Sequence, residues 1–371
     1  MAKKARKPRK QEKAAPRGLP ELRKAIDSVD DQVLALLGER AKLASEVGEA
    51  KRSAAAAPGF YDPEREKQVL ARLSGAGGGV FPAESVPYVF KEIISACRSL
   101  EIEMRIAYLG PQGTYTQIAA RRTFGQSVQL VEAPTIQDVF LAVERDQAEY
   151  GIVPIENSYE GGVAQTLDAL AETELKIRAE TLLDIDHCLL SKETALERIQ
   201  RVYSHPHALA QCRRWLAENL PQAEAVPAKS TAAAAKIVAE EGFAAAIASH
   251  LASEIFGVPV LRDRIQNRTG NRTRFILLHR EDAARTGRDR TSLVLSPKGP
   301  RESLPDLLDV FQKARIRVSR LESRPTSAEP WAYRYFLDIE GHRTDARVVS
   351  ALTKLSKRCR GVKVLGSFPA G

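Results

Sequence analysis

Cysteines are few in this sequence, and they lie far apart. The 371 residues include four, at positions 97, 188, 212 and 359, and no two of them form a C-x-x-C pair. This spacing argues against a zinc site and against a disulfide framework, and it is typical of a protein from a reducing cytoplasm. We therefore expect a cytoplasmic protein that holds no metal.

Long apolar runs are also absent. No stretch approaches 18 consecutive apolar residues, so we expect no membrane-spanning helix. The start of the chain is rich in Lys and Arg with no apolar segment after it, which argues against a secretory signal peptide. The chain is too long for one ordinary core, and its length predicts two or three domains.

The net charge of +9 is concentrated in the first residues. Residues 1–17 hold eight Lys or Arg and one Glu, which gives +7 and leaves only +2 for the rest of the chain. We predict that residues 1–18 form a disordered basic tail. A tail that grips RNA or an acidic partner stays an alternative. No helix-turn-helix, zinc finger or aromatic-basic sheet motif accompanies it, so no specific nucleic-acid partner is expected.

Three helices are predicted before residue 104. Apolar residues recur every three or four positions over residues 19–52, which predicts one amphipathic helix roughly 50 Å long. Asp62 followed by Pro63 is typical of a helix start and predicts a second helix to about residue 73. Residues 84–103 are predicted to form the third. The first helix cannot bury its apolar stripe alone, so we expect partner helices to cover it.

Two cations, Arg40 and Lys51, lie about three turns apart on the first helix, on a face that overlaps its apolar seam. Snorkelling, with the stems on apolar surface and the charges in water, explains either cation alone. With Arg23, Asp62 and Arg65 added, the pattern resembles the all-helical chorismate mutase family. That family builds its site in an intertwined dimer, with one arginine supplied by the partner's long helix.

The resemblance implies an isomerase reaction that needs neither nucleophile nor cofactor. Chorismate rearranges to prephenate within one molecule, so the site must hold a folded dicarboxylate and stabilise negative charge on the breaking ether oxygen. The implied roles are carboxylate binding by Arg40, Arg65 and, serving the other protomer, Arg23; contact with the ether oxygen by Lys51; and substrate binding by Asp62, Glu66 and Cys97.

One position departs from the family pattern. The third helix offers Glu101, one turn after Cys97, where a glutamine often donates to the ether oxygen. An ionised carboxylate has no hydrogen to donate, whereas a protonated carboxyl has one. We therefore predict that mutase turnover falls as the pH rises and that Glu101→Gln flattens the profile. The alternative is that Glu101 faces solvent.

Residues 105–278 alternate short strands with helices, which predicts an α/β region. A Gly-Pro-x-Gly turn at 110–113 leads the strand 105–109 into a helix. The free backbone N–H groups at the start of that helix, near Thr114, are suited to an anion. By the same argument Ser230, which opens a later helix, is a second candidate for a substrate carboxylate.

Polar side chains follow two further predicted strands. Glu156 and Asn157 come directly after the strand 150–155, at the carboxyl end, where α/β sheets bind ligands. Ser204 follows the strand 201–203 and precedes a helix that carries Gln211. These side chains are therefore candidates for one substrate site.

The stretch 266–275 is a polar loop broken by glycine that ends in Thr273, Arg274 and Phe275 and enters an apolar strand. Catalytic groups are often placed on such loops. Together with residues 110–115, 154–158 and 204–206, it resembles the prephenate dehydratase family. The resemblance implies two lobes, like a periplasmic binding protein, with the site in the cleft. Residues 176–190 and 258–264 would be the crossovers between the lobes.

The implied lyase reaction removes CO2 and the ring hydroxyl of prephenate to give phenylpyruvate. Aromatisation drives it, so the enzyme has only to protonate the departing hydroxyl and bind two carboxylates. By resemblance Thr273 donates to that hydroxyl. We expect His207 to be a solvated first-turn histidine. The residues expected to position the substrate are Glu156, Asn157, Ser204 and Gln211, with Arg274, Thr114 and Ser230 as carboxylate partners.

After a charged linker at 281–290, residues 291–368 are predicted to form a ferredoxin-like βαββαβ unit. Residues 321–325 and 338–342 resemble the regulatory ACT domain, which binds phenylalanine. A glutamate stands at 302, where that family usually has glycine, so weaker phenylalanine binding is predicted. The expected effector residues are Glu302, Ser303, Leu304, Glu322, Ser323, Arg324 and Pro325.

From about Leu19 onward the chain resembles the bifunctional chorismate mutase–prephenate dehydratases. The resemblance implies a homodimer or homotetramer with mutase, dehydratase and ACT domains at 19–104, 105–280 and 291–371. A fusion to a prephenate dehydrogenase is rejected, because the glycines at 75–79 follow no strand and do not complete a dinucleotide fingerprint. A non-catalytic sensor with a binding-protein-like cleft stays an alternative.

Overall fold

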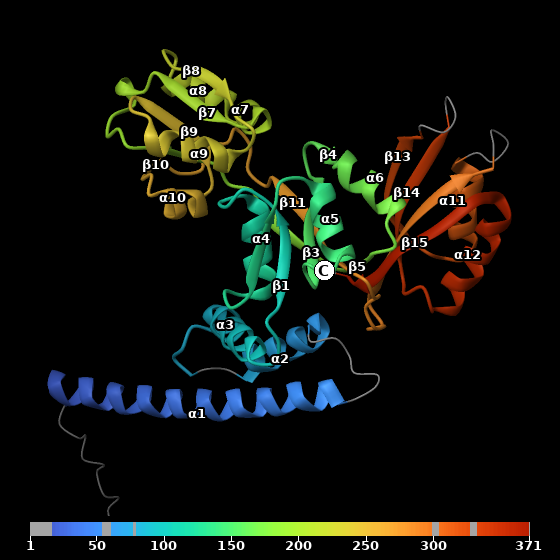
Figure 1. Ribbon diagram of the computed structural model, residues 1–371, viewed down its shortest axis with the longest axis horizontal. Coiled ribbons are helices and arrows are strands. Elements are labelled where there is room, and N and C mark those ends of the chain that lie inside the picture. The colour runs from blue at the N-terminus through green and yellow to red at the C-terminus, as the bar shows by residue number, and fades with distance from the viewer. Residues whose placement is uncertain (1–16, 54–60, 77–78, 299–303, 327–331, 371) are drawn as a thin grey trace, which may run out of the picture.

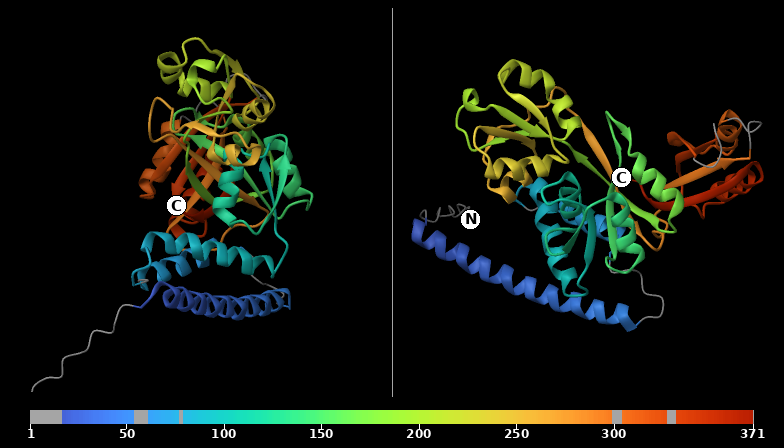
Figure 2. Two further views of the ribbon diagram at one scale, coloured as in Figure 1. Left: turned by 90° about the vertical axis from the view of Figure 1, so that its left-hand side faces the viewer. Right: turned by 45° about the horizontal axis from the view of Figure 1, so that its top comes forward.

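The computed structural model describes residues 17–53, 61–76, 79–298, 304–326 and 332–370. Three parts follow one another along the chain: a group of helices, a two-lobed α/β region and a C-terminal sheet with its own helices (Figure 1). Two further views show the same parts from other sides (Figure 2). Most of the predicted basic tail lies outside the described residues. No helix in these described ranges is both long and apolar enough to span a membrane.

The helical part consists of α1 (Leu19–Ser53), α2 (Pro63–Ala76) and α3 (Val86–Ser99), with a short 3₁₀ helix, η1 (Ala83–Ser85), before α3. Asp62 caps α2 as predicted, because its Oδ1 accepts from the backbone N–H of Arg65 at 2.9 Å. The third helix was predicted to reach residue 103. It ends at Ser99 in a turn, in which the N–H of Glu101 donates to the carbonyl of Arg98, before β1 begins at Arg105.

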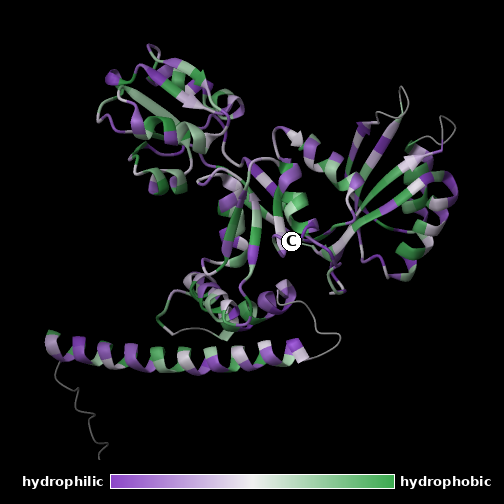
Figure 3. Ribbon diagram, in the orientation of Figure 1, coloured by the Kyte–Doolittle hydropathy of each residue, from purple (hydrophilic) through white to green (hydrophobic). Residues whose placement is uncertain are grey.

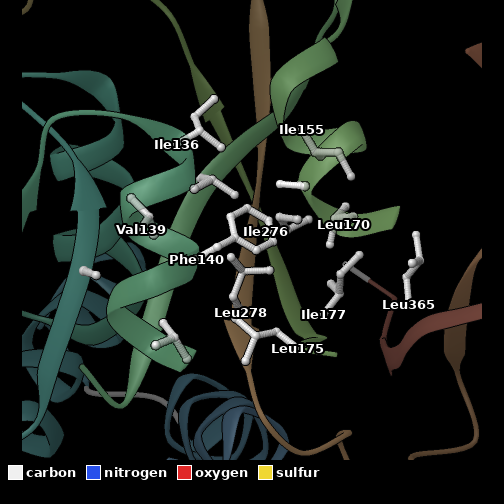
Figure 4. Close-up of a cluster of buried hydrophobic side chains, with 14 of the residues drawn as sticks. Ile136, Val139, Phe140, Ile155, Leu170, Leu175, Ile177, Ile276, Leu278 and Leu365 are labelled. Atoms are coloured by element: carbon white, nitrogen blue, oxygen red, sulfur yellow. The ribbon is translucent and has the colours of Figure 1, made fainter. Parts of the chain in front are cut away.

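The first lobe is built on a mixed sheet with the strand order β2-β1-β3-β11-β5, and β4 pairs with β3. The strands are β1 (Arg105–Leu109), β2 (Gln129–Ala133), β3 (Tyr150–Asn157), β4 (Gly161–Gly162), β5 (Lys176–Asp184) and β11 (Arg272–His279). The helices are α4 (Tyr115–Phe124), α5 (Ile136–Glu144) and α6 (Ala164–Glu172). Phe140 from α5, Ile155 from β3 and Ile276 from β11 meet in its core (Figure 4).

The second lobe has the strand order β10-β6-β9-β7-β8. Its strands are β6 (Cys188–Ser191), β7 (Arg201–Ser204), β8 (Glu224–Pro227), β9 (Ala244–Ala248) and β10 (Val260–Arg262). Its helices are α7 (Pro206–Gln211), α8 (Arg213–Asn219), α9 (Thr231–Glu240), α10 (His250–Phe256) and the 3₁₀ helix η2 (Leu196–Arg198). The helix predicted to carry Gln211 and Cys212 is two short helices, and the break falls at Cys212.

Two crossover segments join the lobes. The first, residues 185–187, links β5 to β6 and lies within the predicted run 176–190. The second, residues 263–271, links β10 to β11 and extends seven residues beyond the predicted return at 258–264. This second segment contains most of the polar loop before Thr273, so that loop lies between the two lobes.

The C-terminal part is the predicted βαββαβ unit, with the antiparallel strand order β13-β14-β12-β15. Its elements are β12 (Asp289–Pro297), α11 (Leu304–Lys313), β13 (Val318–Pro325), β14 (Tyr333–Glu340), α12 (Ala346–Arg358) and β15 (Cys359–Pro369). Leu365 joins the core of the first lobe on the side of Ile177 (Figure 4). A Cβ at Gly366 would lie 2.2 Å from the carbonyl oxygen of Ile177, so glycine permits β15 to approach β5 this closely.

Helix α1 lies along one side of the molecule, and its N-terminal half extends beyond α2 and α3 (Figure 1). Gly48 is its one buried residue. Apolar residues recur along the whole helix (Figure 3). Most of them face solvent: Leu22, Ile26, Val29, Val33, Leu34, Leu36, Leu43 and Val47 are each 43% exposed or more. Within one chain, the predicted partner helices therefore cover only part of the stripe.

Two candidate active sites

A cavity of about 380 Å³ lies between α1, α2 and α3. Each of the three helices contributes some apolar and some charged side chains to its wall. Seven residues expected to serve the mutase reaction line it: Arg40, Lys51, Asp62, Arg65, Glu66, Cys97 and Glu101. Leu43, Val47, Val69 and Ile94 supply the apolar part of its wall.

Lys51 and Glu101 form an ion pair in this cavity. Lys51 Nζ lies 3.0 Å from Glu101 Oε2, and 22% and 12% of the two side chains are exposed. Gly48, one turn before Lys51, makes this approach possible, since a Cβ there would lie 3.1 Å from the Cα of Glu101. The alternative that Glu101 faces solvent is therefore wrong.

Arg98 lines the same cavity and was not predicted. It is buried, forms an ion pair with Glu66, and donates from Nη2 to the carbonyl of Phe124 on α4 at 2.5 Å. Burial raises the pKa of Glu66, and the positive charges of Arg98 and Lys91 oppose the shift. The sequence signal was an arginine directly after Cys97, but no motif marked Arg98 as a site residue.

Arg23 is not brought to this cavity. It is exposed on the N-terminal half of α1, and 17 residues separate it from Arg40, which corresponds to about 25 Å along the helix. Its expected contribution to the site of another protomer stays a prediction.

The second candidate site is a chain of hydrogen-bonded side chains that runs from the first lobe to the second. Asn157 Nδ2 donates to Thr273 Oγ1 at 2.9 Å and to Asn271 Oδ1 at 2.8 Å. Asn271 Nδ2 donates in turn to Gln211 Oε1 on α7 at 2.9 Å. Pairing of β3 with β11 sets Thr273 opposite Asn157, so the strand register creates this contact. Asn271 was not predicted, although it lies in the polar loop.

His187 continues this chain and was also not predicted. Its Nε2 lies 3.0 Å from Gln211 Oε1, and its Nδ1 lies 3.0 Å from the hydroxyl of Tyr115 on α4. Burial lowers the pKa of His187, with Gln211 and Asp186 opposing the shift, so the imidazole is neutral near pH 7. No signal marked this histidine, because it lies inside an apolar strand-like run in the sequence.

Gln211 also borders a cavity of about 320 Å³, which lies in the range of small-molecule sites. The cavity brings residues of the second crossover, such as Gln266 and Arg268, against α7 and the segment after β3. Gln211 Nε2 is 3.5 Å from Glu160 Oε1, which also lines the cavity. A substrate here would meet amide groups, one cation and one carboxylate.

Arg274 and Glu156 do not join the Thr273 cluster. Adjacent side chains on a strand point to opposite faces, so Arg274 points away from Thr273 toward the C-terminal sheet. It is buried, with Nη1 2.6 Å from Asp338 Oδ2 and Nε 2.8 Å from Glu180 Oε2. Glu156 lies 3.5 Å from Arg274 and 3.0 Å from Arg320 of β13. The expected contact of Arg274 with a substrate carboxylate is not supported, because its guanidinium is enclosed by acids.

The other three hydroxyl groups that were expected in the dehydratase site hydrogen bond to backbone groups instead. Thr114 caps α4 and donates to the carbonyl of Leu109 at 3.0 Å, and Ser230 caps α9. Ser204 is fully buried and donates to the carbonyl of Ile247 at 2.6 Å. The sequence placed them correctly at helix starts or strand ends, but the structure does not bring them to Thr273. His207 is exposed, as predicted.

The expected effector motif lies on β13 against the first lobe. Arg324 pairs with Asp168 of α6 at 2.7 Å. The Glu322 carboxylate sits on Gly162 of β4, where a Cβ would clash with it at 2.0 Å. Ser323 and Pro325 lie on the same strand, and Leu304 begins α11. Residues 302 and 303 lie outside the described residues.

The chain matches two protein-family profiles, chorismate mutase type II over residues 22–102 and prephenate dehydratase over residues 106–283. A bifunctional chorismate mutase/prephenate dehydratase of Aquifex aeolicus (strain VF5) is 42% identical over 355 residues, which cover 95% of this chain and 98% of that relative. One from Neisseria gonorrhoeae is 43% identical over 94% of this chain and 96% of its own length. The structure of a prephenate dehydratase from Arthrobacter aurescens in complex with L-Phe is 36% identical, with a TM-score of 0.67, and covers 72% of this chain and 90% of that one. With both catalytic domains in one polypeptide, the chain belongs to the bifunctional chorismate mutase/prephenate dehydratase family.

Proposed function

We infer that this chain catalyses two successive reactions of phenylalanine biosynthesis. It rearranges chorismate to prephenate and then converts prephenate to phenylpyruvate. The observation that carries the inference is that each matched domain contains its own cavity, bordered by side chains suited to its reaction. Neither cavity requires a cofactor for the chemistry described below.

The mutase cavity is lined by four positively charged side chains and three acidic ones, so its lining carries a net positive charge. Arg40, Lys51 and Arg65 face the space between the helices, while Arg98 is paired with Glu66. Arg40 and Arg65 hold the folded dicarboxylate. Glu101 Oε2, which lies 3.0 Å from Lys51 Nζ, keeps the ammonium directed into the cavity. That ammonium stabilises negative charge on the breaking ether oxygen.

In the dehydratase site, Thr273 is poised to donate. Its Oγ1 already accepts a hydrogen bond from Asn157, and the described residues offer its own proton no acceptor. The proton therefore passes to the departing hydroxyl of prephenate, which leaves as water. The electron pair of the breaking bond to CO2 enters the ring, and solvent returns a proton to Thr273 Oγ1. Arg268, on the neighbouring cavity, replaces Arg274 as the cation for a substrate carboxylate.

Phenylalanine is the effector that we assign to the C-terminal part. Two observations support it: the similar prephenate dehydratase was solved with L-Phe, and the βαββαβ unit is the fold of ACT domains. Asp338 pairs with Arg274, the residue after Thr273, so a shift of β14 acts on the catalytic strand. Calorimetric titration of phenylalanine into the wild type and Glu302→Gly tests the assignment. Tighter binding to the variant is expected, and no binding to either protein contradicts it.

A second copy of the chain covers α1. The exposed apolar stripe and the distance of Arg23 from Arg40 support a homodimer, or a homotetramer built from such dimers. Long helices of two copies crossing side by side bury both stripes and place Arg23 of each copy at the other's cavity. We assign the enzyme to the cytoplasm, where its four buried cysteines stay reduced.

The deciding experiment supplies chorismate to the purified full-length protein and follows prephenate and phenylpyruvate separately over time. Transient prephenate followed by phenylpyruvate is expected. Supplying prephenate alone tests the second reaction independently of the first. Absence of both products would leave the alternative of a non-catalytic aromatic-ligand sensor.

A further inference from the structure

A cluster outside both catalytic sites brings three side chains of different chemistry together. Cys188 begins β6, His250 is the first residue of α10, and Asp263 directly follows β10. Cys188 Sγ lies 3.2 Å and His250 Nε2 lies 3.0 Å from the same oxygen, Asp263 Oδ1. All three ligand atoms lie within 4.8 Å of one another. It is the one such group of three among the residues the structure describes.

The ligand set matches zinc and similar borderline divalent ions. Thiolate, imidazole and carboxylate are all zinc ligands, and bond lengths of about 2.0–2.3 Å place tetrahedral ligand atoms roughly 3.3–3.6 Å apart. The two distances to Asp263 Oδ1 need to lengthen by only a few tenths of an ångström to reach that geometry, and Cys188 Sγ and His250 Nε2, which lie within 4.8 Å of each other, would draw together around the ion. One thiolate and one carboxylate also balance the charge of a divalent ion.

The burial of the three residues indicates an open site at the surface. Cys188 is fully buried, whereas 59% of the His250 side chain and 52% of the Asp263 side chain are exposed. The ion therefore has a protein wall on one side and keeps its fourth position for water. Because Cys188 Sγ lies beneath the two exposed residues, a metal is a better fit to this cluster than a thiol nucleophile that must reach a substrate.

The cluster also lies at the connection between the lobes. Cys188 directly follows the first crossover, residues 185–187, and Asp263 begins the second, residues 263–271. His250 follows Ser249, whose hydroxyl donates to the carbonyl of Gly113 in the first lobe at 3.0 Å. An ion bound to all three residues would hold both crossover segments beside the contact between Ser249 and Gly113.

We propose that Cys188, His250 and Asp263 form a binding site for a zinc-class divalent ion, which fixes the two crossover segments and slows the dehydratase. On binding, the thiol proton passes to solvent, the sulfur, imidazole and carboxylate bind the ion, and no electron is transferred. This site was not foreseen from the sequence, because its ligands are 62 and 13 residues apart and form no motif.

Cobalt(II) titration of the untagged, reduced full-length protein tests the site. One equivalent per chain should give a thiolate-to-cobalt absorption band and tetrahedral visible bands, and zinc should remove both. His250→Ala should weaken binding about tenfold or more. His207→Ala is the matched control, since His207 is an equally exposed histidine in the first turn of a helix in the same lobe. Its spectrum should equal that of the wild type.

Because Asp263 is largely exposed, Asp263→Asn should fold even if Cys188→Ser does not. The proposal can therefore be tested with the Asp263 variant. With zinc, phenylpyruvate formation by the wild type should fall while chorismate consumption is unchanged, and Asp263→Asn should resist the inhibition. Absence of the thiolate band in the wild type, or its persistence in Cys188→Ser, would overturn the site. Equal zinc inhibition of the wild type and Asp263→Asn would overturn the restraint of the crossovers.

Discussion

The two candidate catalytic sites differ in how completely a single chain forms them. The dehydratase cluster is closed within one chain, since Thr273, Asn157, Asn271 and Gln211 hydrogen bond in series across both lobes. The mutase cavity has one long helix as a wall, and that helix turns most of its apolar side chains to solvent. One chain therefore forms the dehydratase cluster by itself, whereas we propose that a second copy completes the mutase cavity.

Removal of one hydroxyl should break the dehydratase side of the comparison most strongly. Thr273→Ala should reduce phenylpyruvate formation by about 10²–10⁴, because the donor to the departing hydroxyl is lost. Chorismate consumption should stay at the wild-type rate, since the helical part is untouched. Thr273→Ser, which keeps the hydroxyl, is the control and should retain most activity. An alanine variant within a few-fold of wild type would remove Thr273 from its role.

Mixing two inactive variants should break the mutase side. Arg23→Ala and Arg40→Ala should each lose about 10²–10³ in mutase rate. After co-refolding in equal amounts, about half of the dimers are mixed, and each has one intact site of two, so about one quarter of wild-type activity should return. A mixture of the Arg23→Ala and Arg23→Lys variants is the matched control. Neither copy in such a dimer supplies Arg23, so mixing should restore no activity. If the first mixture stays inactive, Arg23 does not serve the partner's cavity.

The acid at position 101 should give the two activities different pH profiles. The expectation from the sequence, that a neutral Glu101 donates to the ether oxygen, predicts mutase turnover that falls as the pH rises and a flatter profile for Glu101→Gln. The ion pair with Glu101 favours Lys51 in that position instead. Dehydratase turnover on supplied prephenate is the internal control and should be unaffected. Matching pH–rate curves for the two proteins would leave Lys51 as the group at the ether oxygen.

The smallest expected effect concerns the junction between the helical part and the first lobe. Tyr61 packs on Phe124 with ring centroids 4.7 Å apart, and His279 stacks on Tyr150 at 4.6 Å. Burial, helped by the positive charge of Arg178, lowers the pKa of His279. The folded state therefore holds this imidazole neutral while the unfolded chain binds a proton below about pH 6.5, so stability falls as the pH falls.

His279→Phe keeps an aromatic ring on Tyr150 and cannot be protonated. Its thermal midpoint should lose less than that of the wild type between pH 7.5 and pH 5.5. A few degrees at most are at stake, because one histidine contributes a small part of the total free energy of unfolding. Parallel slopes for both proteins would show that His279 does not sense pH.

Local patterns predicted most of the architecture. The spacing of apolar residues gave α1 to within one residue of its observed end, and Asp62 with Pro63 gave the start of α2. The order of strands and helices gave the C-terminal βαββαβ unit. The seven residues around the mutase cavity came from a motif on helices, whose periodicity fixes which side chains share a face.

Side-chain partners could not be predicted in the same way. Arg274 follows Thr273 in the sequence, and only the pairing of β11 within its sheet determines that one faces the cleft and the other the C-terminal part. His187 and Asn271 became neighbours of Gln211 through tertiary packing of the lobes, which leaves no periodic trace in the sequence. The second crossover was missed in part because its polar residues form neither a helix nor a strand.

The contribution of Leu365 and Phe368 to the first lobe has a consequence for synthesis of the chain. The last strand of the first-lobe sheet, β11, ends at His279, but the core beneath that sheet also needs residues 365 and 368. A growing chain adds about 5–20 residues per second, so this core stays open for several seconds after its own sheet has been made. The helices α1–α3 meet no such delay. They emerge first, and they are free to dock on another nascent copy before the dehydratase has folded.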